Sequence, residues 1–217
     1  MGVSAYYQAI PEESRLFHRV QTEKQFSYLF DLLFPYSYGI FYILMWQHED
    51  DGSLDEILDG VAESKEIFNS RSEVDLCFNQ LCAELEQASR LYPGLEDRGI
   101  YLENIQSVFE ERLVRELKSR QLDRLLPYVE KLLGGDRPFG LEPQNGLDLY
   151  IVPSSIVKEG VRIFREVEPE TLFNPALAQL NEVIAPKEEN ALERFEWWRG
   201  FYLEAADKGE AVLIEFC

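Results

Sequence analysis

The chain has 217 residues, of which 46% are hydrophobic and 13% aromatic, and acidic residues outnumber basic ones 40 to 21. This length and apolar content suffice for one full hydrophobic core, and they exclude a disordered tail and a repetitive fibrous protein. The net charge of −19 repels phosphate backbones, so we expect no nucleic-acid partner.

From the sequence we predict neither a targeting signal nor a membrane-spanning segment. A basic region followed by an apolar stretch is missing near Met1, so no signal peptide is predicted. The longest apolar run, residues 38–46, is far shorter than the ~20 residues of a membrane-spanning helix. Three cysteines, Cys77, Cys82 and Cys217, form no Cys-x-x-Cys pair. Reduced thiols, a cytoplasmic location and no membrane association are therefore expected.

The first elements follow from hydrophobic spacing. Residues 3–10 are β-prone and predict a strand that ends at Pro11. Apolar residues then recur at steps of three and four from residue 12 to 34, which predicts one helix that stops before Pro35. The apolar run 36–46 fits a buried strand or a buried helix, because it is too short for its period to decide.

Two longer helical regions are predicted in the middle of the chain. The first covers residues 72–91, with Ser72 as its cap and Pro93-Gly94 as its stop. The second runs from Leu102 to Gly134-Gly135, with a break or kink near Pro127. Residues 134–147 have loop composition and form the candidate internal linker.

The last part of the chain alternates between strand and helix patterns. We predict a strand over 147–152, a helix over 153–164 with Ser154 or Ser155 as cap, and a short helix after Pro169. The final helix has the clearest stripe, which consists of Ala191, Phe195, Trp198, Tyr202 and Ala205. Lys208-Gly209 ends it, and residues 211–216 form a closing strand.

Together these elements predict a single α+β domain over residues 1–217, in which several amphipathic helices are packed on a small mixed sheet. We expect this sheet to include the N-terminal and C-terminal strands as partners or neighbours. Both strands are short and β-prone, and each flanks a strongly patterned helix.

Three stretches of the sequence resemble a known family. They are the opening Met1-Gly2-Val3-Ser4-Ala5-Tyr6-Tyr7-Gln8-Ala9-Ile10, the segment Leu149–Val157 and the ending Trp198–Phe216. These stretches are similar to the YfbM-like family of uncharacterised bacterial proteins. The middle departs from the family pattern, as does Ile184-Ala185-Pro186, where the family has an aromatic residue before proline. The resemblance implies a compact cytoplasmic α+β domain and supplies no catalytic residue.

The candidate catalytic and metal-binding residues fit simpler interpretations. The run His48-Glu49-Asp50-Asp51 has metal-ligand chemistry, but its spacing matches neither the calcium loop nor the zinc helix motif, so a solvated acidic loop is expected. His18 is expected to be an ordinary helix histidine. The sequence contains no nucleophile elbow, phosphate loop or dinucleotide-binding turn, so no cofactor is predicted.

Two further segments are expected to be structural. The glycines of residues 134–140 suit anion binding, but Asp136 opposes it, so a connector is expected. The basic residues of 109–124 alternate with acids, as in Glu111 with Arg115 and Glu116 with Arg120, which is typical of an exposed salt-bridged helix.

The strongest functional hypothesis is a non-catalytic interaction module that binds a basic protein through an acidic face around residues 49–66. Trp197, beside Phe201, either widens the buried face of the last helix or forms an exposed aromatic patch. The candidate partner-binding residues are Glu49, Asp50, Asp51, Asp55, Glu56 and Trp197. The alternative is an enzyme of unrecognised type that uses dispersed carboxylates, with or without a metal.

Overall fold

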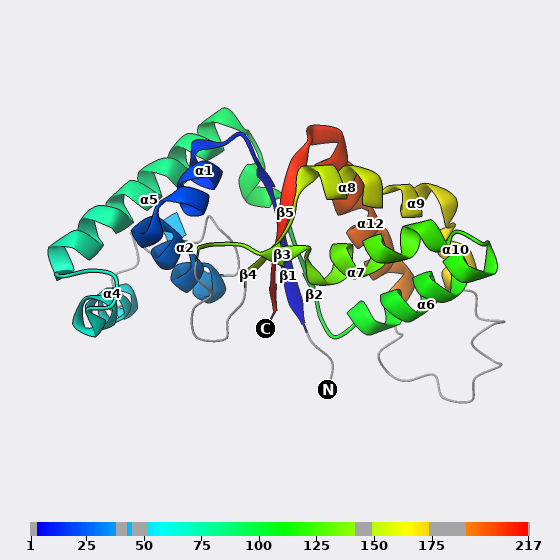
Figure 1. The fold of residues 1–217 in the computed structure, drawn as a ribbon, viewed down its shortest axis with the longest axis horizontal. Coiled ribbons are helices and arrows are strands. Elements are labelled where there is room, and N and C mark those ends of the chain that lie inside the picture. Colours follow the sequence, from blue (N-terminus) through cyan, green and yellow to red (C-terminus); the bar gives the residue numbers. More distant parts are fainter. Residues whose placement is uncertain (1–3, 38–42, 45–51, 142–148, 174–189, 217) are drawn as a thin grey trace. The chain divides into compact units, whose positions relative to one another are not determined.

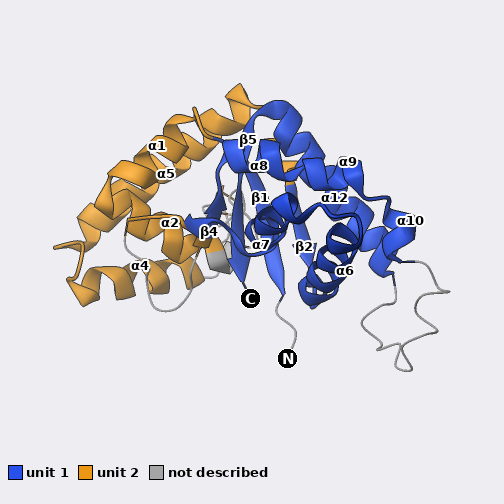
Figure 2. Ribbon diagram, turned by 45° about the vertical axis from the view of Figure 1, so that its right-hand side comes forward, with its two compact units in different colours: residues 1–11, 99–137, 150–217 blue, residues 12–98, 138–149 orange. Residues whose placement is uncertain are grey.

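The computed structural model describes residues 4–37, 43–44, 52–141, 149–173 and 190–216. These residues divide into two compact units (Figure 2). The first unit consists of residues 1–11, 99–137 and 150–217, and the second consists of residues 12–98 and 138–149. Each unit therefore combines segments that are far apart in the sequence. No helix in the part of the chain described is long and apolar enough to cross a bilayer.

A five-stranded sheet joins the two ends of the chain (Figure 1). Its order is β2 (Gly99–Leu102), β1 (Ala5–Pro11), β5 (Glu210–Phe216), β4 (Leu149–Val152) and β3 (Arg137–Pro138). Strand β1 pairs antiparallel with both β2 and β5, and Tyr7 lies opposite Ile214 in the second pair. The prediction of an α+β fold whose sheet contains both terminal strands is confirmed.

One face of β1 and β5 forms the wall of the first unit's core. Because side chains alternate along a strand, Ala5, Tyr7 and Ala9 all lie on this face, where Val212 and Ile214 join them. The Tyr7 hydroxyl donates a hydrogen bond of 3.0 Å to the backbone oxygen of Leu133. This bond satisfies a buried polar group that would otherwise reduce stability.

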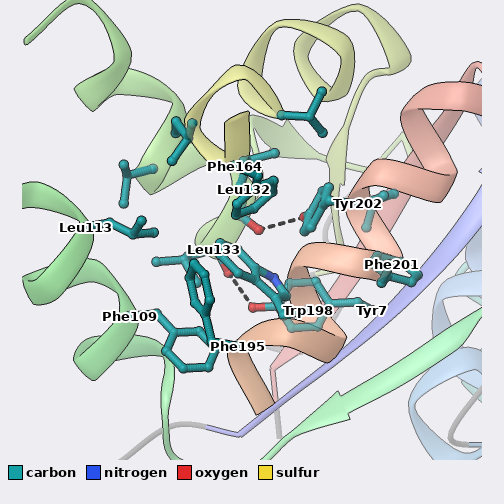
Figure 3. Packing of buried hydrophobic residues seen from close by; sticks show 14 of the residues in the cluster. Tyr7, Phe109, Leu113, Leu132, Leu133, Phe164, Phe195, Trp198, Phe201 and Tyr202 are labelled. Atoms are coloured by element: carbon teal, nitrogen blue, oxygen red, sulfur yellow. Dashed lines mark hydrogen bonds between the residues drawn. The ribbon is translucent and has the colours of Figure 1, made fainter. Parts of the chain in front are cut away.

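Six helices of the first unit contribute to this core. They are α6 (Gln106–Ser119), α7 (Leu126–Gly134), α8 (Ser154–Gly160), α9 (Arg162–Glu166), α10 (Pro169–Leu172) and α12 (Ala191–Lys208). Figure 3 shows the centre, where Trp198 of α12 meets aromatic side chains from α6 and α9. Its ring centroid lies 5.1 Å from that of Phe164 and 5.6 Å from that of Phe109. The stripe predicted for α12 is buried in this cluster.

The second unit is helical. It contains α1 (Arg15–Thr22), α2 (Lys24–Ser37), α4 (Ser53–Ser64), α5 (Arg71–Leu91) and the 3-10 helix η1 (Leu95–Asp97). Helices α1, α2 and α4 all contact α5, the longest helix. The Oγ atom of Ser14 accepts a hydrogen bond from the backbone of Phe17 and thereby caps α1.

Several predicted boundaries in the second unit are wrong. The helix predicted over 12–34 is divided at Glu23, whose backbone is extended, and its second part continues through Pro35. The α5 cap is Ser70 and not Ser72, since the Ser70 Oγ atom accepts from the backbone of Glu73. Of the segment 36–46, residues 36 and 37 form the end of α2, residues 43 and 44 are helical, and the others lie outside the described residues.

Corrections in the first unit concern short elements. Leu102 belongs to strand β2 and not to the following helix, which begins at Gln106. The break predicted near Pro127 is present, because α6 ends at Ser119, the 3-10 helix η2 (Asp123–Leu125) follows, and Pro127 stands in the first turn of α7. The helix predicted over 153–164 is two helices, and its N-cap is Pro153 instead of Ser154 or Ser155.

Candidate functional site

Helix α4 carries two of the predicted partner-binding residues. Asp55 and Glu56 lie in its first turn, where acidic side chains interact favourably with the positive end of the helix dipole, and both are exposed. Asp59 and Glu63 are also exposed on this helix, which contains no basic residue. We call these four residues the α4 acidic face. The predicted residues Glu49, Asp50 and Asp51 lie outside the described residues.

Part of this face is tied to α5 by one arginine. The Arg71 guanidinium donates hydrogen bonds to Asp55 at 2.6 Å and to Asp75 at 2.7 Å, and it also pairs with Asp59. Hydrogen bonding to Asp55 is the largest of the effects that raise the pKa of Arg71. Because one positive charge faces three carboxylates, the cluster keeps an excess of negative charge. Asp55 therefore has a structural partner already, whereas Glu56 and Glu63 lie outside the Arg71 cluster.

A second polar cluster surrounds Arg19 at the end of α1, and sequence reasoning missed it. The side chain of Arg19 is 12% exposed, and its guanidinium carbon lies 4.1 Å from the centre of the Phe26 ring. Two of its nitrogens donate to the Glu23 carboxylate at 2.8 and 2.7 Å. It also donates to Gln80 at 2.7 Å and to Glu84 at 3.2 Å, both on α5. This cluster joins α1 to α5.

Two hollows of about 410 and 430 Å³ lie beside Arg19, both within the second unit. Arg19, Glu23 and Gln80 line both of them. Their volumes are within the range of small-molecule sites, which is about 300–1,000 Å³. The first hollow is also lined by Lys24, Gln25, Phe26, Glu73, Leu76 and Cys77, and the second by Arg15, Ala83, Glu84 and Gln87.

Cys77 lines the first hollow, and its environment makes its thiol unreactive. Its side chain is buried, and burial raises the pKa of the Cys77 thiol to about 11. A thiol with this pKa is almost entirely protonated at neutral pH, and only the thiolate is an effective nucleophile. No disulfide bond joins Cys77 or Cys82 to another residue in the part of the chain that the structure describes.

Among the described residues, Asp31, Glu210 and Glu215 are also buried carboxyl groups. Burial raises the pKa of Asp31 on α2 to about 8 and that of Glu215 on β5 to about 7. Over the described ranges of the chain, no three His, Cys, Asp or Glu residues form a group that fits a metal ion. His18 is exposed on α1. The predicted metal-like run His48–Asp51 falls outside the described residues.

Two arginines, Arg112 in α6 and Arg120 directly after it, make contacts within the first unit. Arg120 pairs with Glu116 at 2.6 Å, as the sequence predicts, and donates to the backbone oxygen of Glu166 at 2.7 Å. Arg112 donates to the backbone oxygen of Leu172 at 2.6 Å. These contacts hold α6 against the short helices α9 and α10.

The two neighbouring tryptophans of α12 have opposite environments. Trp198 is fully buried, whereas the side chain of Trp197 is 60% exposed. Phe201, which the sequence pairs with Trp197, lies in the core and is 9% exposed. Trp197 is therefore an exposed aromatic side chain without Phe201 as a surface neighbour.

Comparisons with protein-family models, with curated proteins and with solved structures found no match. The resemblance to the YfbM-like family therefore continues to stand on the sequence motifs alone. We propose it on that ground.

Proposed function

We propose that this protein is a non-catalytic interaction module that binds a basic protein partner through the α4 acidic face. The observation that carries the proposal is the one-sided charge of α4, which contains four exposed acids and no basic residue. Arg71 offsets one of these charges, and residues 49–51 add three more acids just before the helix. Such a surface attracts a basic partner over a distance set by ionic strength.

The structural role of Asp55 determines which variants test the proposal. Replacing Asp55 removes a ligand of Arg71 and disturbs the packing of α4 on α5 as well as the surface charge. Glu56 and Glu63 are exposed and outside the Arg71 cluster. The double variant Glu56→Gln/Glu63→Gln therefore changes the charge of the face and leaves the Arg71 cluster in place.

The experiment is affinity capture of the tagged protein from its native cells at ~50 mM and ~300 mM salt, followed by mass spectrometry. We expect one stoichiometric basic partner that is lost at high salt and is lost or reduced with Glu56→Gln/Glu63→Gln. The matched control is Glu110→Gln/Glu130→Gln, which removes the same charge from exposed positions of α6 and α7. A partner that survives high salt and ignores the α4 variant would contradict the proposal.

The alternative is a small-molecule or enzymatic role for the second unit. The observation in its favour is the pair of hollows beside Arg19, in which Glu23 and Glu84 supply carboxylates. A thermal-shift screen of metals and metabolites tests this alternative, since a ligand that binds only the folded state raises the unfolding temperature. A shift that disappears in Gln80→Ala would favour the alternative over the interaction module.

A further inference from the structure

The exposed side of α12 carries a regular line of residues. Glu193, Trp197, Gly200 and Glu204 follow one another at steps of four, three and four, so they lie along one side of the helix. All four are exposed, and the buried stripe around Trp198 lies on another side. We call these four residues the α12 stripe.

Two residues of the α12 stripe are unfavourable choices for a free surface. Trp197 exposes a large aromatic ring to water at 60% of its side-chain area. Gly200 stands in the middle of a helix, where glycine is among the least favourable residues. These two residues are neighbours on the helix surface, because they are three positions apart.

Packing does not require a glycine at position 200. The backbone of Gly200 has no positive φ, and apart from its chain neighbours and the backbone of its own helix, no atom of the described residues lies within 4 Å of the place where a Cβ atom would be. Gly160 on α8 shows the contrast, because a Cβ atom there would lie 3.0 Å from the Leu132 side chain. Gly200 instead leaves open space on the side of the helix that also carries Trp197.

The exposed charges along the α12 stripe are mostly negative. Glu196 and Asp207 are exposed next to it, and Lys208, at the end of the helix, pairs with Glu204. The two arginines of α12, Arg194 and Arg199, are half-buried, and Arg194 donates to the backbone oxygen of Glu103 at 3.0 Å. A cation is attracted to the face of an indole ring, and the attraction is stronger when carboxylates are close. Arginine fits best, since its flat guanidinium stacks on an aromatic ring and still donates paired hydrogen bonds to a carboxylate.

We propose that the α12 stripe binds an arginine-containing basic segment of a partner protein. The guanidinium stacks on Trp197 and pairs with Glu193, and the backbone of the partner segment passes over Gly200. Glycine at position 200 lets the partner segment approach the helix closely. This inference does not depend on the α4 acidic face, which belongs to the other unit.

The test uses a fluorescent synthetic peptide of about ten residues that alternates arginine and serine, with lysine–serine and glutamate–serine peptides for comparison. Fluorescence anisotropy with the full chain gives the dissociation constants. We expect the arginine peptide to bind more tightly than the lysine peptide. Trp197→Ala raises the dissociation constant of the arginine peptide about two- to fivefold, the usual range for an exposed cation–π contact.

Gly200→Ala gives the sharpest variant, because stability and binding move in opposite directions. Alanine favours the helix and meets no neighbour, so the unfolding temperature rises. The added methyl group fills the opening, so binding of the arginine peptide weakens. Misfolding cannot explain a loss of binding in a variant that is more stable.

Matched controls separate this site from general attraction to an acidic protein. Tyr101→Ala removes another exposed aromatic side chain of the same unit, and Glu110→Gln removes one exposed charge from α6. Both are expected to bind the arginine peptide like the unmodified chain, whereas Glu193→Gln binds it more weakly. Equal affinity for the arginine and lysine peptides, or full binding by Trp197→Ala and Gly200→Ala, overturns the proposal.

The Glu56→Gln/Glu63→Gln variant keeps the two proposals distinguishable. If it alone loses the arginine peptide, the α12 stripe is rejected and the α4 acidic face is supported. If only the α12 variants fail to bind the peptide, the α12 stripe is supported and the α4 acidic face is not the binding site of the peptide. Self-association that Trp197→Ala abolishes, without any binding of the peptide, would assign the stripe to a second copy of the chain and also overturn the proposal.

Discussion

In the first unit, Trp198 lies among the rings of Phe109, Phe164 and Phe195, and the cluster carries no formal charge. In the second unit, the contact between α1 and α5 includes the guanidinium of Arg19 and two carboxylates. The contribution of apolar packing to stability changes little with salt concentration or pH, whereas that of ion pairs depends on both. The two units should therefore respond differently to mutation, salt and pH, and four variants test this difference.

The largest effect is expected in the aromatic core. Trp198→Ala leaves a cavity that the neighbouring rings fill only in part, so it should lower the free energy of unfolding by about 3–5 kcal/mol. The matched control is Trp197→Ala, whose exposed side chain should cost less than about 0.5 kcal/mol. Denaturant unfolding measures both, and equal costs would contradict the buried position of Trp198.

The Arg19 cluster should give the next largest effect. Arg19→Ala leaves the buried carboxylate of Glu84 with the exposed Arg15, at 2.9 Å, as its one remaining charged partner among the described residues. We expect a loss of about 2–4 kcal/mol, since an uncompensated buried charge is costly. Arg90→Ala breaks an exposed pair with Glu86 and should cost about 0.5 kcal/mol. Similar losses in the two variants would mean that burial of the Arg19 cluster adds nothing.

Asp31 should make the second unit sensitive to pH. Burial raises its pKa from 3.8 to about 8, so the folded state binds the proton more tightly than the unfolded chain does. Its contribution to stability is therefore full below about pH 4 and is lost as the pH rises towards 8. Between these two pH values the free energy of unfolding should fall in both proteins, and the fall should be smaller in Asp31→Asn by at least about 1 kcal/mol. Urea unfolding at both ends of the range measures this, and the exposed Asp97→Asn should leave the pH dependence unchanged.

The smallest effect is expected at Arg71. Arg71→Ala removes the charge that holds Asp55 and Asp75, so the three aspartates of the cluster repel one another. Because these groups are partly exposed, the cost should be about 1 kcal/mol at low salt and less at high salt. A cost that does not change with salt would show that Arg71 acts through packing of its aliphatic part.

Local sequence patterns predicted the long elements and the pairing of the ends. The stripe of α12 extends over four turns, so its period is unambiguous, and it is buried as expected. Strand β2 was missed because it has four residues, and Leu102 and Ile105 are spaced as in a helix. The extension of α2 beyond Pro35 runs against the usual effect of proline, which shows that a local rule can be overridden in the folded chain.

For the candidate sites too, some features could be predicted from the sequence and others could not. Composition and charge alone indicated the acidic segment and the absence of a recognised catalytic motif. The Arg19 cluster was not predictable, because Glu84 is 65 residues from Arg19 and no local pattern marks the two as partners. Adjacent tryptophans differ by about 100° around a helix, so the sequence predicts that Trp197 and Trp198 diverge. The exposure of Trp197 came from the structure.

The sequence by itself determined which segments have one apolar side, where α5, α7 and α12 end, and that the protein is strongly acidic. These properties depend on residues within a few positions of one another, so they can be read without a fold. Tertiary structure alone decided which charges are buried, which acids are paired with Arg71, and which glycine is free of packing. Those outcomes depend on contacts between distant segments, and burial changes the energy of a charge far more than its sequence neighbours do.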